Sequence, residues 1–387
     1  MSSKYTFPQD LEKFKAYIYK AISPILPAND DSPAPKDFFS KIKRTDAGRN
    51  LPEHYLVYFL LVDLLGFDDY GRSEKVAWSI PIAFNNKVFL IEYRKMGLGL
   101  FAYDAQNEEI EAKKIVALIN KAAKKIKPYF TWQAGVAMDS SDLNVENHSA
   151  VLFERYNFFL NQYKSIIKEI AQTKIDKNIT LHAIFPLMHR LNNHKEWLAL
   201  STIDAFFSWT EHIFIHLAIF KENLYLGKQV AKLALADWQS KFKAALDITN
   251  ELKPLYDQLC LIKEQIRNYI SHGAFGKQGE AFKFHSTIGA VPVFLPKQKE
   301  KFQFSFVQNS EFRDDQAIAI IESFISKLWA GSRETAGMYI QESRLPIILS
   351  LVKDGTYTEA METLEKMDFL IQRLSEACDN ASNMDWF

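Results

Sequence analysis

The sequence predicts a mainly α-helical protein whose N-terminal α/β region contains a small antiparallel sheet. Three observations lead to this fold class. Apolar residues recur at helical spacing through most of residues 146–380, β-branched and aromatic runs concentrate between residues 76 and 103, and a second β pattern interrupts the helices between residues 281 and 307. We therefore expect an N-terminal α/β region, then a helical bundle with an inserted β-ribbon and C-terminal helices.

The N-terminal region combines helical and strand patterns. Proline-rich sequence after residue 22 marks an irregular connection, and Pro52 stands in the first turn of a second helix, where its missing N–H donor is harmless. The tripeptide Asn85-Asn86-Lys87 between two apolar runs indicates a hairpin. The expected elements are, in order, helices 9–22 and 51–65, strands 77–84, 88–93 and 96–103, and helix 108–126.

The remaining chain is predicted to be almost wholly helical. Helices are expected at residues 146–177, 195–227, 229–248, 251–272, 312–330, 332–343, 345–353 and 358–380. The β-ribbon is expected from 281–286 and 301–307, either side of Val291-Pro292-Val293. The polar run 138–144 is the natural boundary between domains. We expect an N-terminal α/β domain at 1–140, a helical domain at 141–332, and a C-terminal helical extension at 333–387 that packs on it.

Composition limits the possible functions. The 387 residues are 48% hydrophobic and 14% aromatic, which is ample for folded cores. Lys plus Arg and Asp plus Glu number 47 each, so any affinity for nucleic acid must come from a local patch. Cys260 and Cys378 provide neither a disulfide nor a zinc framework, which suits a reducing compartment.

We expect a cytoplasmic protein without a membrane span. The first residues lack the apolar segment and cleavage site of a signal peptide. Apolar stretches such as 55–67 and 213–220 are shorter than the roughly 18 uninterrupted residues that a membrane helix needs.

The most informative stretch is the end of the expected helix 251–272. It carries Arg267, Asn268 and His272, followed by Gly273. At helical spacing the apolar residues of this helix form one stripe, which must be buried. That stripe consists of Leu255, Leu259, Ile262, Ile266 and Ile270. Arg267, Asn268 and His272 lie off the stripe, and Asn268 and His272 are neighbours on one face because they are four residues apart.

The pattern Arg267-Asn268-x3-His272 resembles the signature of HEPN-domain ribonucleases. The resemblance covers the motif and a helical context from about residue 145 to 330, so the helical domain 141–332 is expected to be HEPN-like. It implies a homodimer in which two motifs form one metal-independent, cofactor-free site that cuts RNA. Arg267 and His272 would be catalytic, with Asn268 supporting them. One subgroup carries a modifiable Tyr two residues after the His, where this chain has Ala274.

The resemblance also implies a mechanism. His272 would exchange protons with the ribose 2′-hydroxyl or the 5′-oxygen, and Arg267 would stabilise charge on the phosphorane oxygens. The product would be a 2′,3′-cyclic phosphate, and DNA would be inert because it lacks the 2′-hydroxyl. Such an enzyme fits a toxin or phage-defence effector, with a neutralising or regulatory protein as a further partner.

Four other residues are candidates around this site. If helix 195–227 packs against the motif helix, as in the resembled fold, Glu211 or His212 could face the site and orient Arg267. Lys263 and Lys277, on either side of the motif, are candidate contacts for RNA phosphates.

Other patterns favour structural interpretations. His212 and His216 have zinc-ligand spacing, but the HExxH order is absent and aromatic residues surround them, so histidines of the core are favoured and no metal is expected. Glu92-Tyr93-Arg94-Lys95 is interpreted as a solvated strand end. Helix 111–127 carries six lysines followed by Tyr129, Phe130 and Trp132, and solvated lysines are favoured over an RNA platform.

Two alternative functions remain open. A glycine after the last periodic residue and a histidine in the last turn are also typical of a plain helix end. The chain would then be a non-catalytic helical interaction protein. It could instead be a sensor that binds a partner or ligand through its N-terminal domain.

Overall fold

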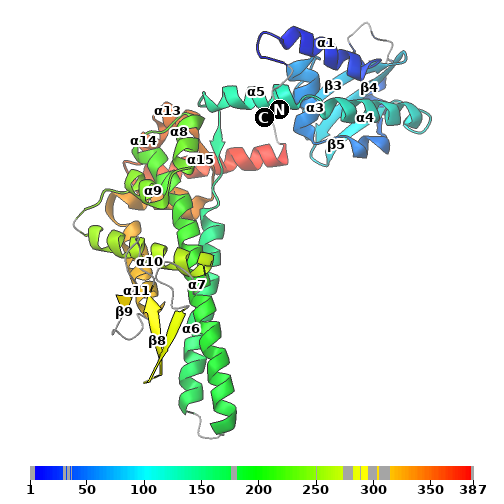
Figure 1. Cartoon of the computed structure of the whole chain (residues 1–387). Coiled ribbons are helices and arrows are strands. Elements are labelled where there is room, and N and C mark those ends of the chain that lie inside the picture. The colour runs from blue at the N-terminus through cyan, green and yellow to red at the C-terminus, as the bar shows by residue number, and fades with distance from the viewer. Residues whose placement is uncertain are drawn as a thin grey trace. The chain divides into compact units, whose positions relative to one another are not determined.

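The computed structural model of the chain describes residues 5–28, 32, 35, 37–175, 181–249, 251–272, 282–287, 289–294, 303–304 and 314–384. For residues 175, 181–183, 265–272, 282–284, 292–294, 303–304 and 332 it describes the backbone alone. The chain is mainly helical and has a small antiparallel sheet near its N-terminus, as the sequence predicts (Figure 1). It divides into two compact units. Unit 1 comprises residues 1–138 and 372–387, and unit 2 comprises residues 139–371.

Unit 1 contains a five-stranded antiparallel sheet among its described residues. Its strands are β1 (Leu26–Pro27), β2 (Lys43–Arg44), β3 (Val76–Phe84), β4 (Lys87–Arg94) and β5 (Gly97–Ala102), in the order β1-β3-β4-β5-β2. Asn85 and Asn86 join β3 to β4, both with positive φ (51° and 58°), as a two-residue hairpin turn requires. The three predicted strands are therefore confirmed. The two-residue strands β1 and β2 are additional.

Most helices of unit 1 cover one face of this sheet, and one short helix packs on the other. The described helices of unit 1 are α1 (Leu11–Ile22), α2 (Phe38–Lys41), α3 (His54–Tyr58), which continues as a π-helix over Phe59–Leu64, α4 (Glu109–Ala123) and α5 (Lys127–Met138). Phe14 of α1 and Ile115 of α4 are buried in one core with Ile82 and Ile91 of the strands. On the opposite face, Phe38 of α2 packs with Leu90 and Phe101 in a smaller cluster. The patterns predict α1, α3 and α4 but miss α2 and α5.

Unit 2 is built on a helical hairpin. α6 (Ser149–Ile175) and α7 (Leu181–Lys221) lie side by side and are antiparallel (Figure 1). Next come α8 (Gly227–Ala234), α9 (Trp238–Ala245), α10 (Lys253–His272) and α11 (Asp314–Leu328). Between α10 and α11 lies the β-ribbon, formed by β7 (Phe282–Ser286), β8 (Gly289–Phe294) and β9 (Gln303–Phe304). The predicted inserted ribbon is therefore confirmed.

Several short elements and one long helix follow α11. These are α12 (Glu334–Gly337), a π-helix at Met338–Ser343, α13 (Leu349–Lys353), α14 (Thr356–Ala360) and α15 (Leu364–Asn383). Strand β6 (Asn144–Val145) pairs with β10 (Ile347–Ile348), which joins the start of unit 2 to its end. Residues 372–387, assigned from the sequence to a C-terminal extension of the helical domain, are grouped here with the N-terminal residues.

An aromatic core holds the helices of unit 2 together. Trp209 and Phe214 of α7, Phe242 of α9 and Phe324 of α11 are fully buried. Trp238 is 2% exposed, and its indole N–H donates to the Thr210 hydroxyl at 2.9 Å, so the polar end of this side chain is satisfied inside the core.

Two predicted helices of this unit differ from the structure. The single helix expected at 229–248 is divided into α8 and α9. The Asp237 side chain accepts a hydrogen bond from the Ser240 N–H at 2.7 Å, which begins a new helix at Trp238. Helix α7 begins at Leu181, well before the expected residue 195, and contains Pro186 near its start.

Candidate functional site

Helix α10 docks its apolar stripe into the core of unit 2. Leu259 is fully buried, and Leu255 and Ile262 are 8% and 5% exposed. This part of the stripe is confirmed. Ile266 and Ile270 belong to the turns whose side chains are outside the described part of the chain.

The predicted catalytic residues occupy the last turns of α10. The backbone is helical through His272, so Arg267, Asn268 and His272 are on the helix that the sequence predicts to carry them. Their side chains lie outside the described part, and Lys277 lies outside the described residues altogether. In the helical register, position 267 follows position 263 by four residues and stands on the same face one turn later.

Lys263 joins the face of α10 that carries positions 263 and 267 to α7. Its Nζ is 3.0 Å from Glu211 Oε1, and it lies 4.8 Å from the centroid of the Phe207 ring. The second carboxylate oxygen, Oε2, is 3.1 Å from Nζ of Lys241 on α9. The structure thus brings together Glu211 and Lys263. Each Glu211 oxygen is already paired with a lysine, so Glu211 contacts α10 through Lys263.

Because Lys241 is buried, its ammonium has to be paired with the Glu211 carboxylate. The Lys241 side chain is only 7% exposed, and a buried ammonium is costly unless a charge is paired with it. Desolvation disfavours the ionised form of Glu211, but the hydrogen bonds and charges of Lys263 and Lys241 outweigh it and hold the pKa of Glu211 below its usual value. Glu211 is therefore a carboxylate that ties three helices together.

Lys241 was not among the residues predicted from the sequence, although the pattern of α9 indicates it. The apolar positions of α9 recur at i, i+4 and i+7 as Trp238, Phe242 and Ala245, and Lys241 stands at i+3 within this buried stripe. A lysine on the apolar face of a short helix predicts a buried acidic partner.

His212 takes no part in this cluster's hydrogen bonds. Its Nε2 accepts a hydrogen bond from the backbone N–H of His148 at 2.9 Å, and its ring lies 4.3 Å from that of His216. Desolvation, together with the neighbouring His216 and His148, lowers the pKa of His212 to about 3. A neutral ring is what the acceptor role of Nε2 requires.

His216 is buried and bonded to the backbone. Its Nδ1 lies 3.0 Å from the carbonyl oxygen of His212 and its Nε2 lies 3.2 Å from that of Glu146. Desolvation lowers its pKa, although both carbonyls favour the protonated form. Among the described residues, no group of three or more His, Cys, Asp or Glu side chains is arranged to hold a metal ion.

Glu92 is buried, contrary to the expectation of a solvated strand end, whereas Lys95 of the same strand end is exposed. Glu92 is 7% exposed, and its carboxylate accepts hydrogen bonds from the Ser79 hydroxyl at 3.0 Å and from Arg94 Nε at 2.5 Å. The Arg94 guanidinium lies 3.9 Å from the centroid of the Phe101 ring. The expectation was wrong for Glu92 because Ser79 and Arg94 lie on the same face of the sheet and hydrogen-bond its carboxylate.

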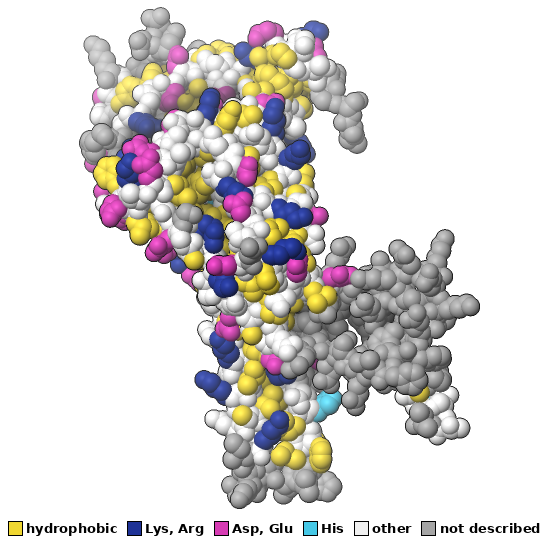
Figure 2. Space-filling view, turned by 90° about the vertical axis from the view of Figure 1, so that its left-hand side faces the viewer, with side chains coloured by type: hydrophobic (Ala, Val, Ile, Leu, Met, Phe, Trp, Pro, Cys, Tyr) yellow, Lys and Arg dark blue, Asp and Glu magenta, His cyan; other side chains and the backbone are white. Residues whose placement is uncertain are grey.

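The aromatic residues after the lysine-rich helix are largely part of the core of unit 1. Tyr129 is 4% exposed, and Trp132 stacks against Phe7 with ring centroids 5.5 Å apart. On the face shown in Figure 2, acidic and basic side chains of the described residues are intermingled. This agrees with the equal numbers of acidic and basic residues in the chain. Any binding of RNA therefore has to come from a local site.

None of the described helices is both long enough and apolar enough to cross a bilayer. Searches of protein-family models, of curated proteins and of solved structures find no match to this chain.

Proposed function

We propose that this chain is a metal-independent endoribonuclease of HEPN type that cuts RNA at the C-terminal end of α10 within a homodimer. The proposal rests on one observation: Arg267, Asn268 and His272 occupy the last turns of a helix that is docked in an all-helical core. The Glu211–Lys263 ion pair, one turn before Arg267, supports it because it fixes the rotation and height of α10 near the motif.

The chemistry follows from the residue types. The 2′-oxygen of the ribose attacks its neighbouring phosphorus, the bond from phosphorus to the 5′-oxygen breaks, and a 2′,3′-cyclic phosphate forms. One imidazole takes the proton of the 2′-hydroxyl and another gives a proton to the leaving 5′-oxygen. The Arg267 guanidinium stabilises the added negative charge on the phosphorane oxygens. Asn268 supports this pair.

Two proton transfers explain the homodimer. A single His272 does not easily serve both oxygens, which lie on opposite sides of the phosphorus during in-line displacement. A twofold axis beside the end of α10 supplies a second His272 and a second Arg267. A toxin or phage-defence effector, controlled by a regulatory protein, is the biological setting that fits such an enzyme.

The decisive experiment is RNA cleavage by the purified chain in EDTA. Wild-type protein should convert RNA to products ending in 2′,3′-cyclic phosphate, detected by mass spectrometry, and an oligonucleotide with one 2′-deoxyribose should resist cleavage at that position. Arg267→Ala and His272→Ala should each lose activity by about a hundredfold or more.

Matched controls are available on α7. Arg190 and His189 are exposed residues of the same two types, so Arg190→Ala and His189→Ala should retain full activity. Cleavage that requires a divalent metal, or full activity in Arg267→Ala and His272→Ala, would overturn the proposal. Intact RNA after incubation with a verified dimer would favour the non-catalytic interaction protein instead.

A further inference from the structure

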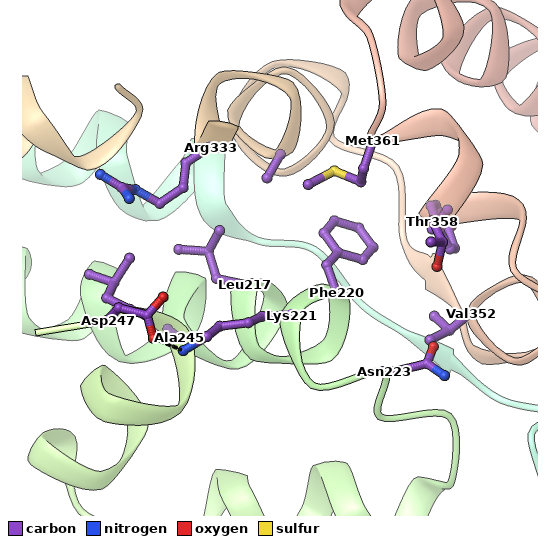
Figure 3. A pocket seen from close by; sticks show the side chains of 13 residues that line it. Leu217, Phe220, Lys221, Asn223, Ala245, Asp247, Arg333, Val352, Thr358 and Met361 are labelled. Atoms are coloured by element: carbon purple, nitrogen blue, oxygen red, sulfur yellow. Dashed lines mark ion pairs between the residues drawn. The ribbon is translucent and has the colours of Figure 1, made fainter. Parts of the chain in front are cut away.

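Unit 2 contains a pocket of about 360 Å³ that RNA cleavage does not require (Figure 3). It lies where the ends of α7 and α9 approach α12, α13 and α14. Its floor is apolar and mostly buried. The apolar lining consists of Leu217, Phe220, Ala245, Leu246, Ala336, Val352, Tyr357 and Met361. Its size is that of pockets that bind small organic molecules.

The pocket is hollow because two helices end beside it. Asn223, just after α7, has a φ of 52°, and this left-handed conformation turns the chain towards α8. Leu246, just after α9, is extended. The segments that follow α7 and α9 diverge at these residues and leave a space that their side chains line.

At the mouth of the pocket stands a lysine whose acidic partner can be replaced. Lys221 Nζ is 3.0 Å from Asp247 Oδ1 and 3.7 Å from Glu222 Oε1, and these two acidic side chains are 81% and 51% exposed. An ion pair with such an exposed carboxylate contributes little and is easily replaced. Lys221 is less exposed, at 31%, and its side chain extends along the pocket towards Asp247 (Figure 3).

A second cation is fixed in the lining. Arg333 donates from Nε to the Leu328 carbonyl at 2.7 Å and from Nη2 to the Lys327 carbonyl at 3.1 Å. These bonds hold the guanidinium in place, and its full positive charge is kept because both acceptors are neutral carbonyls. With Lys221, Arg333 and Asp247, the lining carries two positive groups and one negative group.

We propose that this pocket binds a small amphipathic anion. An apolar ring or chain of the ligand covers the floor beside Phe220 and Met361. Its single carboxylate, sulfonate or phosphate group replaces Asp247 as the partner of Lys221. The exchange costs little because the Lys221–Asp247 ion pair is exposed and weak, and burial of the ligand's apolar part on the pocket floor supplies the binding free energy. The flexible thioether of Met361 adapts to different ring shapes.

Two fluorescent probes test this proposal with the full chain. 8-Anilinonaphthalene-1-sulfonate is an aromatic monoanion, and N-phenyl-1-naphthylamine is its uncharged analogue. We expect both to bind with one site per chain, the sulfonate about tenfold more tightly, since one charge-assisted contact is worth about that factor. Lys221→Met should lower the affinity of the sulfonate to that of the neutral probe and leave the neutral probe unchanged. Asp247→Asn should raise the affinity of the sulfonate.

Controls separate the pocket from non-specific binding. Thr358 is an exposed residue of the lining, so Thr358→Trp should place an indole across the mouth without touching the core and should weaken both probes. Lys232→Met, an exposed lysine of α8 outside the lining, should change neither affinity. Circular dichroism checks that each variant is folded. Absence of saturable binding, or equal sulfonate affinities in wild type, Lys221→Met and Thr358→Trp, would overturn the proposal.

Discussion

The Glu211 carboxylate shows how one residue can set the position of three helices. It receives Lys241 from α9 on one oxygen and Lys263 from α10 on the other, at 3.1 and 3.0 Å. Lys241 is buried and has to be paired, whereas Lys263 is one-third exposed. The two lysines therefore depend on Glu211 to different degrees, and this difference can be measured.

Glu211→Gln should destabilise the chain by about 1–3 kcal/mol, because it leaves the Lys241 ammonium buried without a counter-charge. Lys241→Met should cost less, since methionine suits the apolar stripe of α9 and Glu211 keeps Lys263. Urea unfolding followed by circular dichroism gives both values. An equal or larger loss in Lys241→Met would show that the ammonium itself, and not its need for a partner, stabilises this junction.

The low pKa of His212 predicts that the free energy of unfolding falls in mild acid. Its pKa is about 3 in the folded chain and near 6.5 when unfolded, so the unfolded state binds the proton more readily between these values. The contribution of His212 is fully present above pH 6.5 and is lost as pH falls, at a limiting slope of about 1.4 kcal/mol per pH unit.

The test is to measure the free energy of unfolding between pH 7.5 and 5 in wild type and His212→Gln. Glutamine keeps an acceptor for the His148 N–H but does not titrate, so the pH dependence of the variant should be flatter. His189→Gln, at an exposed histidine of α7, should follow wild type. Parallel curves for wild type and His212→Gln would contradict the low pKa of His212.

At the level of helices and strands, most of the fold could be predicted because long periodic segments carry strong signals. The hairpin at Asn85-Asn86 and the stripe of α10 are examples. The start of α7 was missed because Pro186, which removes one helical hydrogen bond, lies within its first turns. Strands of two residues, such as Leu26–Pro27, have no period to detect.

In the candidate site, too, the local sequence pattern could be predicted, whereas contacts between distant residues could not. The motif at Arg267 and His272 is local in sequence, so it could be located on a helix end without a structure. The contact of Glu211 with Lys263 was anticipated only as a general approach of two helices. Lys241 joins it from a third helix, 30 residues after Glu211, and no local pattern pairs these two residues.

Docking of α10 can be tested with two leucines of the same helix. Leu259 is fully buried and Leu261 is 56% exposed. Leu259→Ala should cost about 2–5 kcal/mol through lost burial and a cavity, whereas Leu261→Ala should change stability by about 0.5 kcal/mol or less. Chemical denaturation measures both. Similar small effects at the two positions would mean that α10 is not held by its apolar stripe.

At the level of the whole molecule, the helical hairpin, the aromatic core and the end of α10 all belong to unit 2. The proposed cleavage chemistry therefore needs unit 2 and a second copy of it. The pocket beside Lys221 also belongs to unit 2, so a bound anion would act on the same body that carries the motif. The N-terminal sheet and its helices supply none of the proposed catalytic groups.

The proposed sharing of one site by two protomers has a quantitative consequence for mixed dimers. If acid and base are the His272 side chains of two chains, a dimer with one His272→Ala chain lacks one proton transfer and is inactive. After equal amounts of wild type and His272→Ala are unfolded together and refolded, about a quarter of the dimers carry two wild-type chains, so activity should fall to about a quarter of that of wild type alone at the same total concentration. Independent sites would leave about half. The matched mixture with His189→Ala should remain fully active, which excludes a loss caused by refolding. Activity of one half in the His272→Ala mixture, with dimers confirmed by sedimentation, would rule out the shared site while leaving a nuclease within each protomer.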